Sequence, residues 1–393
     1  MTTKNPLLIL MLALGVFGII TTEMGIVGVL PQITQKFHVS AAEAGFLVSI
    51  FALVVAISGP FLTLFASGIN RKVILLTAVL FFAISNLAYA YTTSFEVMLA
   101  FRIVPALFHP VFFSVALVTA ARLVPPEKSS QAVTQVFAGI TVGFAFGVPL
   151  SSYLAEKISL EAAFLFSAVV SLIAFAGIFA WLPSMPVSEK MTYGKQLRIL
   201  RNPRLWLQIA SVVFIFAAMF SVYSYFAEYL GQITQMSGSW ISFMLMAFGL
   251  IMILGNFLFG SLLLKSIKKT VFAYPLLYVA VYVLVYFAGP SFLWMSAAVF
   301  VWGIVHSGGL VVSQAWLMTE AQDAPEFGNS LFVSFSNLGI TLGSALGGWF
   351  ISEWGVHHLM WSGVLFAGLA FLMILLRIKG FTAARHKDTH DAA

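Results

Sequence analysis

Four ionisable side chains lie inside long apolar stretches of this sequence, where burial gives them a chemistry that exposed side chains lack. They are Glu23, Arg102, His109 and His306. A charge at the centre of a membrane helix costs roughly 2.5–3.5 kcal/mol, so a residue of this kind usually serves a function. Carboxyl and imidazole groups exchange protons near neutral pH when their surroundings tune them. The four residues are therefore candidates for proton coupling.

Each candidate also has a structural interpretation. Counting along the apolar stretches places Glu23 and Arg102 at a similar depth, where they can pair across a helix bundle. Burial and a nearby cation act in opposite directions on a carboxyl pKa, and this balance suits proton exchange. The alternative is a permanent ion pair that fixes two helices. For His109 and His306, which lie near the middle of their stretches, the alternative is a neutral imidazole bonded to a neighbouring helix.

Six further residues are candidates for substrate contacts: Tyr223, Tyr225, Glu228, Trp302, Gln314 and Asn337. Aromatic and amide groups also form interface belts, core packing and interhelical bonds, and these alternatives stay open. Glu228 ends its apolar stretch, so we expect it at the membrane–water interface, where a carboxylate costs little. No phosphate-cradling loop, nucleophile–base set or paired metal-ligand spacing occurs. We therefore predict neither an enzyme nor a metal or cofactor site.

The composition identifies the elements that must position these residues. Of 393 residues, 61% are hydrophobic and 9% are charged, against roughly 25% charged in soluble domains. The mean hydropathy is +1.00, which predicts a polytopic membrane protein. The chain has no cysteine, which excludes disulfides and thiolate metal sites. The basic residues lie in loops between apolar stretches, so membrane orientation explains the high isoelectric point better than nucleic-acid binding does.

Twelve apolar stretches are long enough to span a bilayer, which requires about 20 residues each. They lie near 7–30, 44–66, 73–93, 96–120, 129–152, 161–182, 205–229, 240–263, 271–289, 292–318, 328–351 and 358–378. A polar interruption over 183–204 separates them into two sets of six. We predict an all-α membrane protein with pseudo-symmetric six-helix halves at 1–182 and 205–379, a central cytoplasmic loop between them and a tail at 380–393.

The basic residues predict the orientation of the chain. If the N-terminus is cytoplasmic, 17 of the 20 lysines and arginines fall in cytoplasmic segments, and only Lys36 and Lys157 lie in outer loops. Cytoplasmic loops of membrane proteins carry such an excess. We therefore expect both termini in the cytoplasm.

A glycine-rich stretch is repeated 200 residues later. Gly139, Gly143 and Gly147 recur every fourth position before Pro149, and 339–347 repeats the pattern. A second echo with the same offset joins 32–35 to 232–235. Two echoes at one offset indicate an internal duplication, although two unrelated packing faces would also carry such glycines. Small residues allow close helix approach, and the proline favours a bend.

Three of these features resemble signatures of one family. They are Thr22-Glu23 followed by 28–31 (Gly-Val-Leu-Pro), Arg102 at the end of 98–102 (Met-Leu-Ala-Phe-Arg), and the glycines with Pro149. Over nearly its whole length the chain resembles the major facilitator superfamily, within it the drug:proton antiporter-1 group, and most of all bacterial arabinose, sugar, nucleoside and drug efflux permeases. The resemblance implies proton-driven efflux by alternating access, with Glu23 as the leading protonation site. It also implies a monomer in the bacterial inner membrane whose partners are lipid, protons and a small-molecule substrate.

One motif departs from that family. The loop between its second and third helices normally carries an acid, a basic residue, a glycine and two basic residues. Here only the final pair, Arg71 and Lys72, is present, so we do not expect the usual cytoplasmic salt bridge to control closure. Efflux of a drug, sugar or nucleoside is the predicted function. A facilitator, an uptake symporter or a substrate sensor of the same fold is the alternative.

Overall fold

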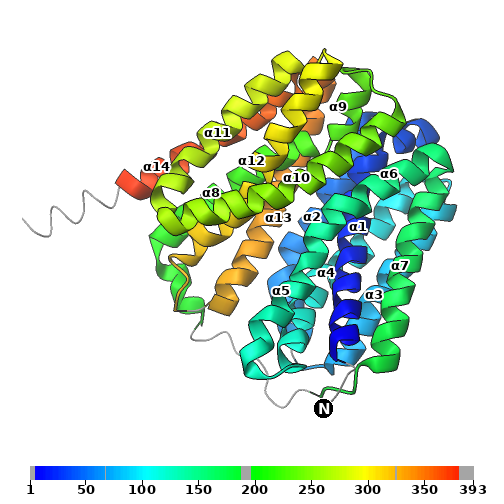
Figure 1. The fold of residues 1–393 in the computed structure, drawn as a ribbon, viewed down its shortest axis with the longest axis vertical. Helices are drawn as coiled ribbons and strands as arrows, with labels where there is room; N and C mark the ends of the chain where they lie inside the picture. The colour runs from blue at the N-terminus through cyan, green and yellow to red at the C-terminus, as the bar shows by residue number, and fades with distance from the viewer. Residues whose placement is uncertain (1–4, 67, 187–195, 324, 380–393) are drawn as a thin grey trace, which may run out of the picture. The chain divides into compact units, whose positions relative to one another are not determined.

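The computed structural model describes residues 5–66, 68–186, 196–323 and 325–379. Their regular secondary structure is helical throughout (Figure 1). Within these ranges, twelve helical segments are long and apolar enough to cross a membrane. The predicted all-α class with twelve spans is thereby confirmed.

The spans are built from helices whose bounds extend or divide several of the predicted stretches. The first unit of the chain begins with α1 (Asn5–Phe37), α2 (Ala41–Ala66), α3 (Arg71–Tyr91), α4 (Phe95–Arg122), α5 (Ser129–Val142), α6 (Val148–Lys157) and α7 (Leu160–Trp181). The remaining helices are α8 (Pro203–Tyr223), α9 (Phe226–Gln232), α10 (Gly238–Lys265), α11 (Ile267–Ala288), α12 (Phe292–Met318), α13 (Pro325–Trp354) and α14 (Met360–Lys379). Short 3₁₀ turns lie at Pro126–Lys128, Gln196–Arg201 and Val356–Leu359.

The chain forms two compact units. The first contains Met1–Thr192 and Ser224–Leu250, and the second contains Tyr193–Tyr223 and Ile251–Ala393. The seventh span is therefore shared between the units, and its helix is interrupted where α8 ends and α9 begins. The sequence-based division at 183–204 stays a prediction.

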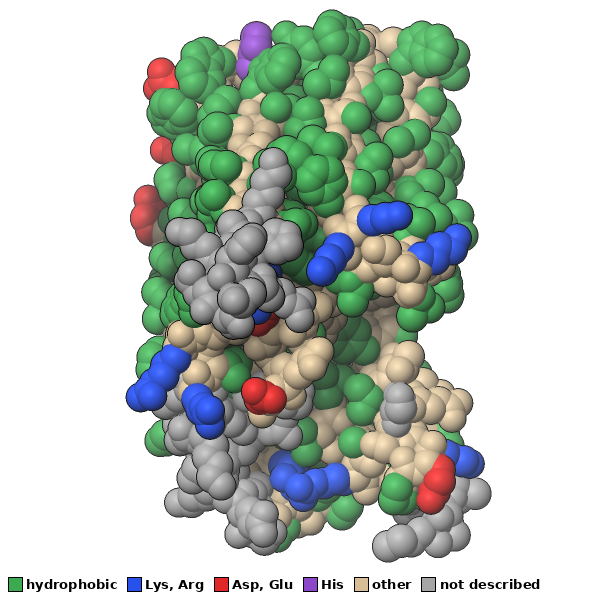
Figure 2. Space-filling model, turned by 90° about the vertical axis from the view of Figure 1, so that its left-hand side faces the viewer, with side chains coloured by type: hydrophobic (Ala, Val, Ile, Leu, Met, Phe, Trp, Pro, Cys, Tyr) green, Lys and Arg blue, Asp and Glu red, His purple; other side chains and the backbone are tan. Residues whose placement is uncertain are grey.

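Hydrophobic side chains cover much of the molecular surface. Leu264, Phe257 and Phe61 are among many large apolar residues that are exposed. Figure 2 shows hydrophobic side chains over the upper part of one face, with the lysine and arginine side chains below them. A surface of this kind suits a lipid environment rather than water.

The glycines of the fifth span, in α5 and the turn that follows it, allow this span to pack closely on α1, which lies beside α5 in Figure 1. A Cβ atom on Gly139 would lie 2.5 Å from the carbonyl oxygen of Ala13, and one on Gly143 would lie 2.6 Å from the Ile20 side chain. Gly147 faces Thr21 in the same way. These three positions therefore have no room for a side chain.

The second unit repeats this packing with the predicted offset. Gly339 of α13 lies against the carbonyl of Val213 in α8, and a Cβ on Gly343 would lie 2.5 Å from the carbonyl oxygen of Ala217. Val213 and Ala217 are 200 residues beyond Ala13 and Phe17, whose carbonyls face Gly139 and Gly143 of the fifth span. The same helix contact thus recurs at the same register, which supports an internal duplication.

The bend near Pro149 takes the form of a π-helical turn. Residues Gly143–Gly147 are π-helical, and the amide of Val148 donates to the carbonyl of Gly143. Pro149 is the second residue of α6 and has no amide hydrogen to continue the α-helical pattern of bonds from the preceding turn. The fifth span therefore continues to Lys157 through a wider turn, instead of ending at the proline.

The glycine contacts predict a stability difference between matched variants. Gly139→Ala places a methyl group against backbone, so we expect a loss of about 1–3 kcal/mol in the free energy of unfolding. Gly260→Ala is the control, because no atom of the described residues lies within 4 Å of its Cβ position. That variant keeps or gains stability, by up to about 1 kcal/mol, since alanine favours a helix more than glycine does. Unfolding of both variants in detergent, followed by circular dichroism, tests this. Equal stabilities would contradict the packing described.

Candidate functional site

Glu23 and His109 form a buried acid–imidazole pair in the first unit. Oε2 of Glu23, on α1, lies 3.1 Å from Nε2 of His109, on α4. The side chains are only 6% and 8% exposed, respectively. Neither ring nitrogen of His109 has a hydrogen-bond partner among the described residues, so the contact is an ion pair when the imidazole is protonated and the carboxyl group is ionised. A proton held by this pair changes the charge at a point that is shielded from water.

Arg102 holds the backbone beside this pair. Its guanidinium donates from Nε to the carbonyl of Leu47 at 2.9 Å, from Nη1 to that of Thr22 at 2.8 Å and from Nη2 to that of Glu23 at 3.0 Å. It also stacks on the ring of Phe51, 4.5 Å from its centroid. The expected pairing with the Glu23 carboxylate is replaced by these backbone bonds, because the planar guanidinium distributes its donors over three carbonyls.

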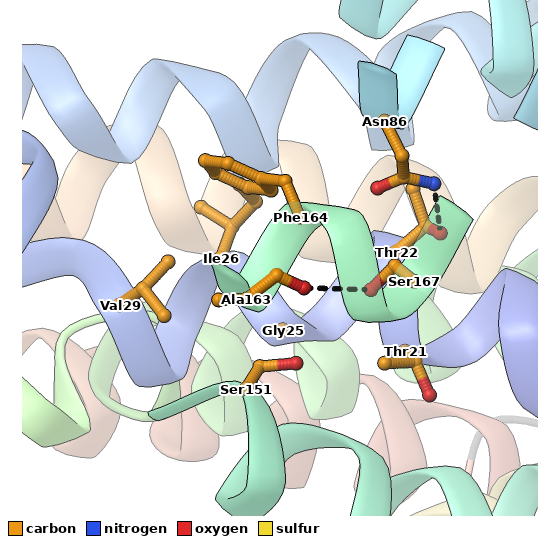
Figure 3. Close-up of a pocket in the computed structure, with 10 residues that line it drawn as sticks. All are labelled: Thr21, Thr22, Gly25, Ile26, Val29, Asn86, Ser151, Ala163, Phe164 and Ser167. Carbon is orange, nitrogen blue, oxygen red and sulfur yellow. Dashed lines mark hydrogen bonds between the residues drawn. The ribbon is translucent and has the colours of Figure 1, made fainter. Parts of the chain in front are cut away.

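The Thr22 hydroxyl, next to Glu23 on α1, is also held by hydrogen bonds. Asn86 of α3 donates from Nδ2 to the Thr22 hydroxyl and to the Phe82 carbonyl, both at 2.8 Å, and the Thr22 hydroxyl donates to Gly18. Figure 3 shows Asn86 and Thr22 at a small cavity that α1, α3, α6 and α7 enclose. Asn86 acts here as a bond between helices, and it orients the turn of α1 that carries Glu23.

His306 lies in an aromatic cluster of the second unit. The hydroxyl of Tyr278 is 2.7 Å from its Nδ1, and the ring of Tyr223 is 4.8 Å away between centroids. Trp302 lies edge-on at 6.4 Å. All four residues are at most 1% exposed, so they fill the interior of this unit. Sequence reasoning missed Tyr278, although the four-residue spacing of Tyr274, Tyr278 and Tyr282 places all three on one helix face.

The two clusters occupy matching places in the duplicated sequence. Tyr223 stands 200 residues after Glu23, and Trp302 stands 200 residues after Arg102. In each unit the first residue of the pair contacts a histidine, His109 or His306. The ionisable residues Glu23 and Arg102 of the first unit therefore correspond to the aromatic residues Tyr223 and Trp302 in the second.

The other predicted substrate residues are held by local partners. Tyr225 places its hydroxyl against Gly45, where an added Cβ would collide with it. Asn337 donates to the Val333 carbonyl at 2.9 Å, and Gln314 donates to Asn329 at 3.3 Å. Their contribution to substrate binding stays a prediction.

Glu228 differs from the expectation of an interfacial carboxylate. It is 7% exposed and accepts a hydrogen bond from the side chain of Gln232, one turn along α9. Because the chain folds the end of the seventh span against α1, a residue near the end of an apolar stretch becomes buried.

The loop before α3 is organised around a residue that sequence reasoning passed over. Asn70 Oδ1 accepts from the amides of Lys72 at 3.0 Å and Met185 at 3.3 Å. The Arg71 amide donates to Met185, and Lys72 Nζ donates to the carbonyl of Phe179 at 2.8 Å. The basic pair therefore helps to attach the beginning of the central loop to this turn. An asparagine before the first helical residue is a familiar capping signal.

Comparison with known proteins gives a family of membrane transporters, the one that the sequence motifs resemble. A sequence model of the Major Facilitator Superfamily matches residues 12–324 and again 209–392. The "Inner membrane transport protein YdhP" of Escherichia coli (strain K12) is 31% identical over 369 residues, which cover 94% of this chain and 95% of that protein. A "Probable sugar efflux transporter" of Helicobacter pylori (strain G27) is 28% identical over 89% of this chain and 90% of its own length.

A solved structure has the same fold at low sequence identity. A bacterial homologue of the human lysosomal transporter Spinster, in an inward-facing and unoccupied conformation, superposes with a TM-score of 0.75. It is 16% identical and covers 96% of this chain and 97% of its own. These observations define a polytopic membrane transporter. The chain belongs to the Major Facilitator Superfamily.

Proposed function

We propose that this protein exports a small molecule, such as a sugar, nucleoside or drug, across the bacterial inner membrane in exchange for protons. The observation that carries the proposal is the buried contact between Glu23 and His109, 3.1 Å apart. An acid and an imidazole this close can take up or release a proton, and that gain or loss changes the local charge. Alternating access of the halves to the two sides of the membrane then couples that proton to the substrate.

Two further observations favour export. The π-helical turn at Gly143–Gly147 lies in the glycine–proline stretch that resembles the antiporter motif, and one relative is named as a sugar efflux transporter. The inner-membrane location is supported by the similarity to YdhP, an inner membrane transport protein. Cytoplasmic termini and a monomeric state complete the proposal.

Proton movement in liposomes tests the function. Purified protein is placed in liposomes that contain a pH-sensitive dye and carry an imposed proton gradient. Amphenicols, lipophilic cations, pentoses and purine nucleosides are then added in turn. Proton movement triggered by one class supports antiport and names the substrate class. Substrate flux without proton movement would instead favour a facilitator. Uptake along with protons would favour a symporter, and binding without flux would favour a sensor.

The two buried histidines provide a matched pair of variants. His109→Gln removes the imidazole beside Glu23, so we expect slower proton-coupled export with an altered pH dependence. His306→Gln disrupts the bond to Tyr278 instead, so we expect about 1–3 kcal/mol lower stability and an unchanged pH dependence. Transport rates across a pH series, with melting temperatures for both variants, measure the difference. A changed pH profile in His306→Gln and none in His109→Gln would reverse the assignment.

A further inference from the structure

A second buried carboxyl group lies outside the Glu23 site. Glu228, on α9, is 7% exposed. Its Oε1 accepts from Nε2 of Gln232, whereas its Oε2 has no hydrogen-bond partner in the described part of the chain. Among the ion pairs of the described residues, none involves this carboxyl group. It is therefore a membrane-embedded acid with a single neutral partner.

The charged side chains of the described residues on α1 and α2, which pack near Glu228, contact other groups. Helix α9 packs on α1. On α1, Glu23 contacts His109 and Lys36 contacts Glu161. Tyr225, just before α9, contacts Gly45 on α2. The charged residue beside that contact, Glu43, accepts a hydrogen bond from the Ser40 hydroxyl. None of these contacts gives Glu228 a cation.

A buried carboxylate without a cation is unfavourable, whereas a protonated carboxyl group is a neutral polar group that burial penalises far less. The bond from Gln232 reaches Oε1 and is compatible with both forms. Oε2 is thus the atom that can gain or lose a proton without breaking a bond within the protein. The side chain stays oriented through the exchange.

We infer that Glu228 is a second proton-carrying residue of the transport cycle. Its Oε2 holds a proton in the arrangement described here and releases it to water when transport exposes the side chain. The inference rests on the proposed proton-coupled function, to which it adds a second carrier in the seventh span. Two carriers move more protons per substrate than Glu23 does by itself.

Infrared spectroscopy of the purified protein at neutral pH tests the protonation directly. A protonated carboxyl group has a carbonyl stretching band that ionised carboxylates lack. We expect Glu228→Gln to lose part of this band, and Glu161→Gln, the control beside Lys36, to keep it. The experiment is repeated in a Glu23→Gln background to remove that residue's contribution. If Glu228→Gln does not fold, Glu228→Asp keeps the carboxyl group and shifts the band. A band unaltered by substitution at 228 would overturn the inference.

Proton counting in liposomes tests the role in transport. Relative to wild type, Glu228→Gln should move about half as many protons per substrate, because one of two carriers is lost. An unchanged ratio would overturn the inference and leave the proposed function intact. If the wild type transports substrate without moving protons, the proposed function itself fails. The two failures are therefore distinguishable.

Discussion

Glu23→Gln is expected to abolish substrate-driven proton movement while the protein remains folded. Glutamine keeps the size and hydrogen-bonding capacity of the side chain, but its amide takes up no proton near neutral pH. The carboxyl group that lies 3.1 Å from the imidazole of His109 is thereby lost as a carrier. We expect the transport cycle to stop without this carrier, so that no proton on Glu228 is delivered either. The initial rate of proton movement in liposomes should therefore fall by about two orders of magnitude or more, to the level of protein-free liposomes.

Glu96→Gln is the matched control for this result. Glu96 lies at the beginning of α4, the helix of His109, but it is exposed and bonds only locally to Ser94. We expect wild-type proton movement in that variant. The melting temperatures of both variants show whether the fold is kept. Full proton-coupled export by a folded Glu23→Gln protein would remove Glu23 from the coupling mechanism.

Arg102→Lys is expected to have the largest effect on stability. Lysine keeps the positive charge, but its compact ammonium group cannot reproduce a planar fork that reaches three carbonyls. Losing two charge-assisted hydrogen bonds at roughly 1.5–3 kcal/mol each lowers the free energy of unfolding by about 3–6 kcal/mol. Because two of the three carbonyls belong to Thr22 and Glu23, the turn that positions the acid is disturbed as well.

Equilibrium unfolding in mixed detergent micelles measures this loss. Arg122→Lys is the control, since Arg122 lies exposed in the last turn of the same helix. We expect its stability to change by less than about 0.5 kcal/mol. If the two variants unfold alike, the backbone bonds of Arg102 do not stabilise the fold, and its role is confined to charge.

The sequence predicts the class of fold well because membrane burial constrains every residue of a span. Twelve apolar stretches and the glycine repeat are visible as patterns, and the structure places Gly139 and Gly339 against matching helices. The prediction that Glu23 is a site residue follows from the same rule, since an acid in an apolar stretch is rare. These features can be predicted because each depends only on composition or on local spacing along the chain.

The partners of the site residues depend on geometry that no pattern contains. Arg102 donates to backbone carbonyls, and Glu23 contacts His109, because α1, α2 and α4 pack together at the same depth. Every residue of an apolar stretch carries a carbonyl, so the sequence gives no sign of which one will accept a bond. The burial of Glu228 is hidden for a related reason: it arises from the packing of α9 on α1, far away in the chain.

The replacement of Glu23 and Arg102 by Tyr223 and Trp302 in the duplicated half has an evolutionary consequence. After a gene duplicates and fuses, the two copies need not retain the same task. Under the proposed function, the half that carries the ionisable residues is constrained by proton coupling, because most substitutions there stop transport. The aromatic copy has no such constraint and accepts changes of ring size and polarity. Under the proposed function, new substrate specificities can therefore arise by drift in the second half, while the coupling between proton and substrate is inherited unchanged.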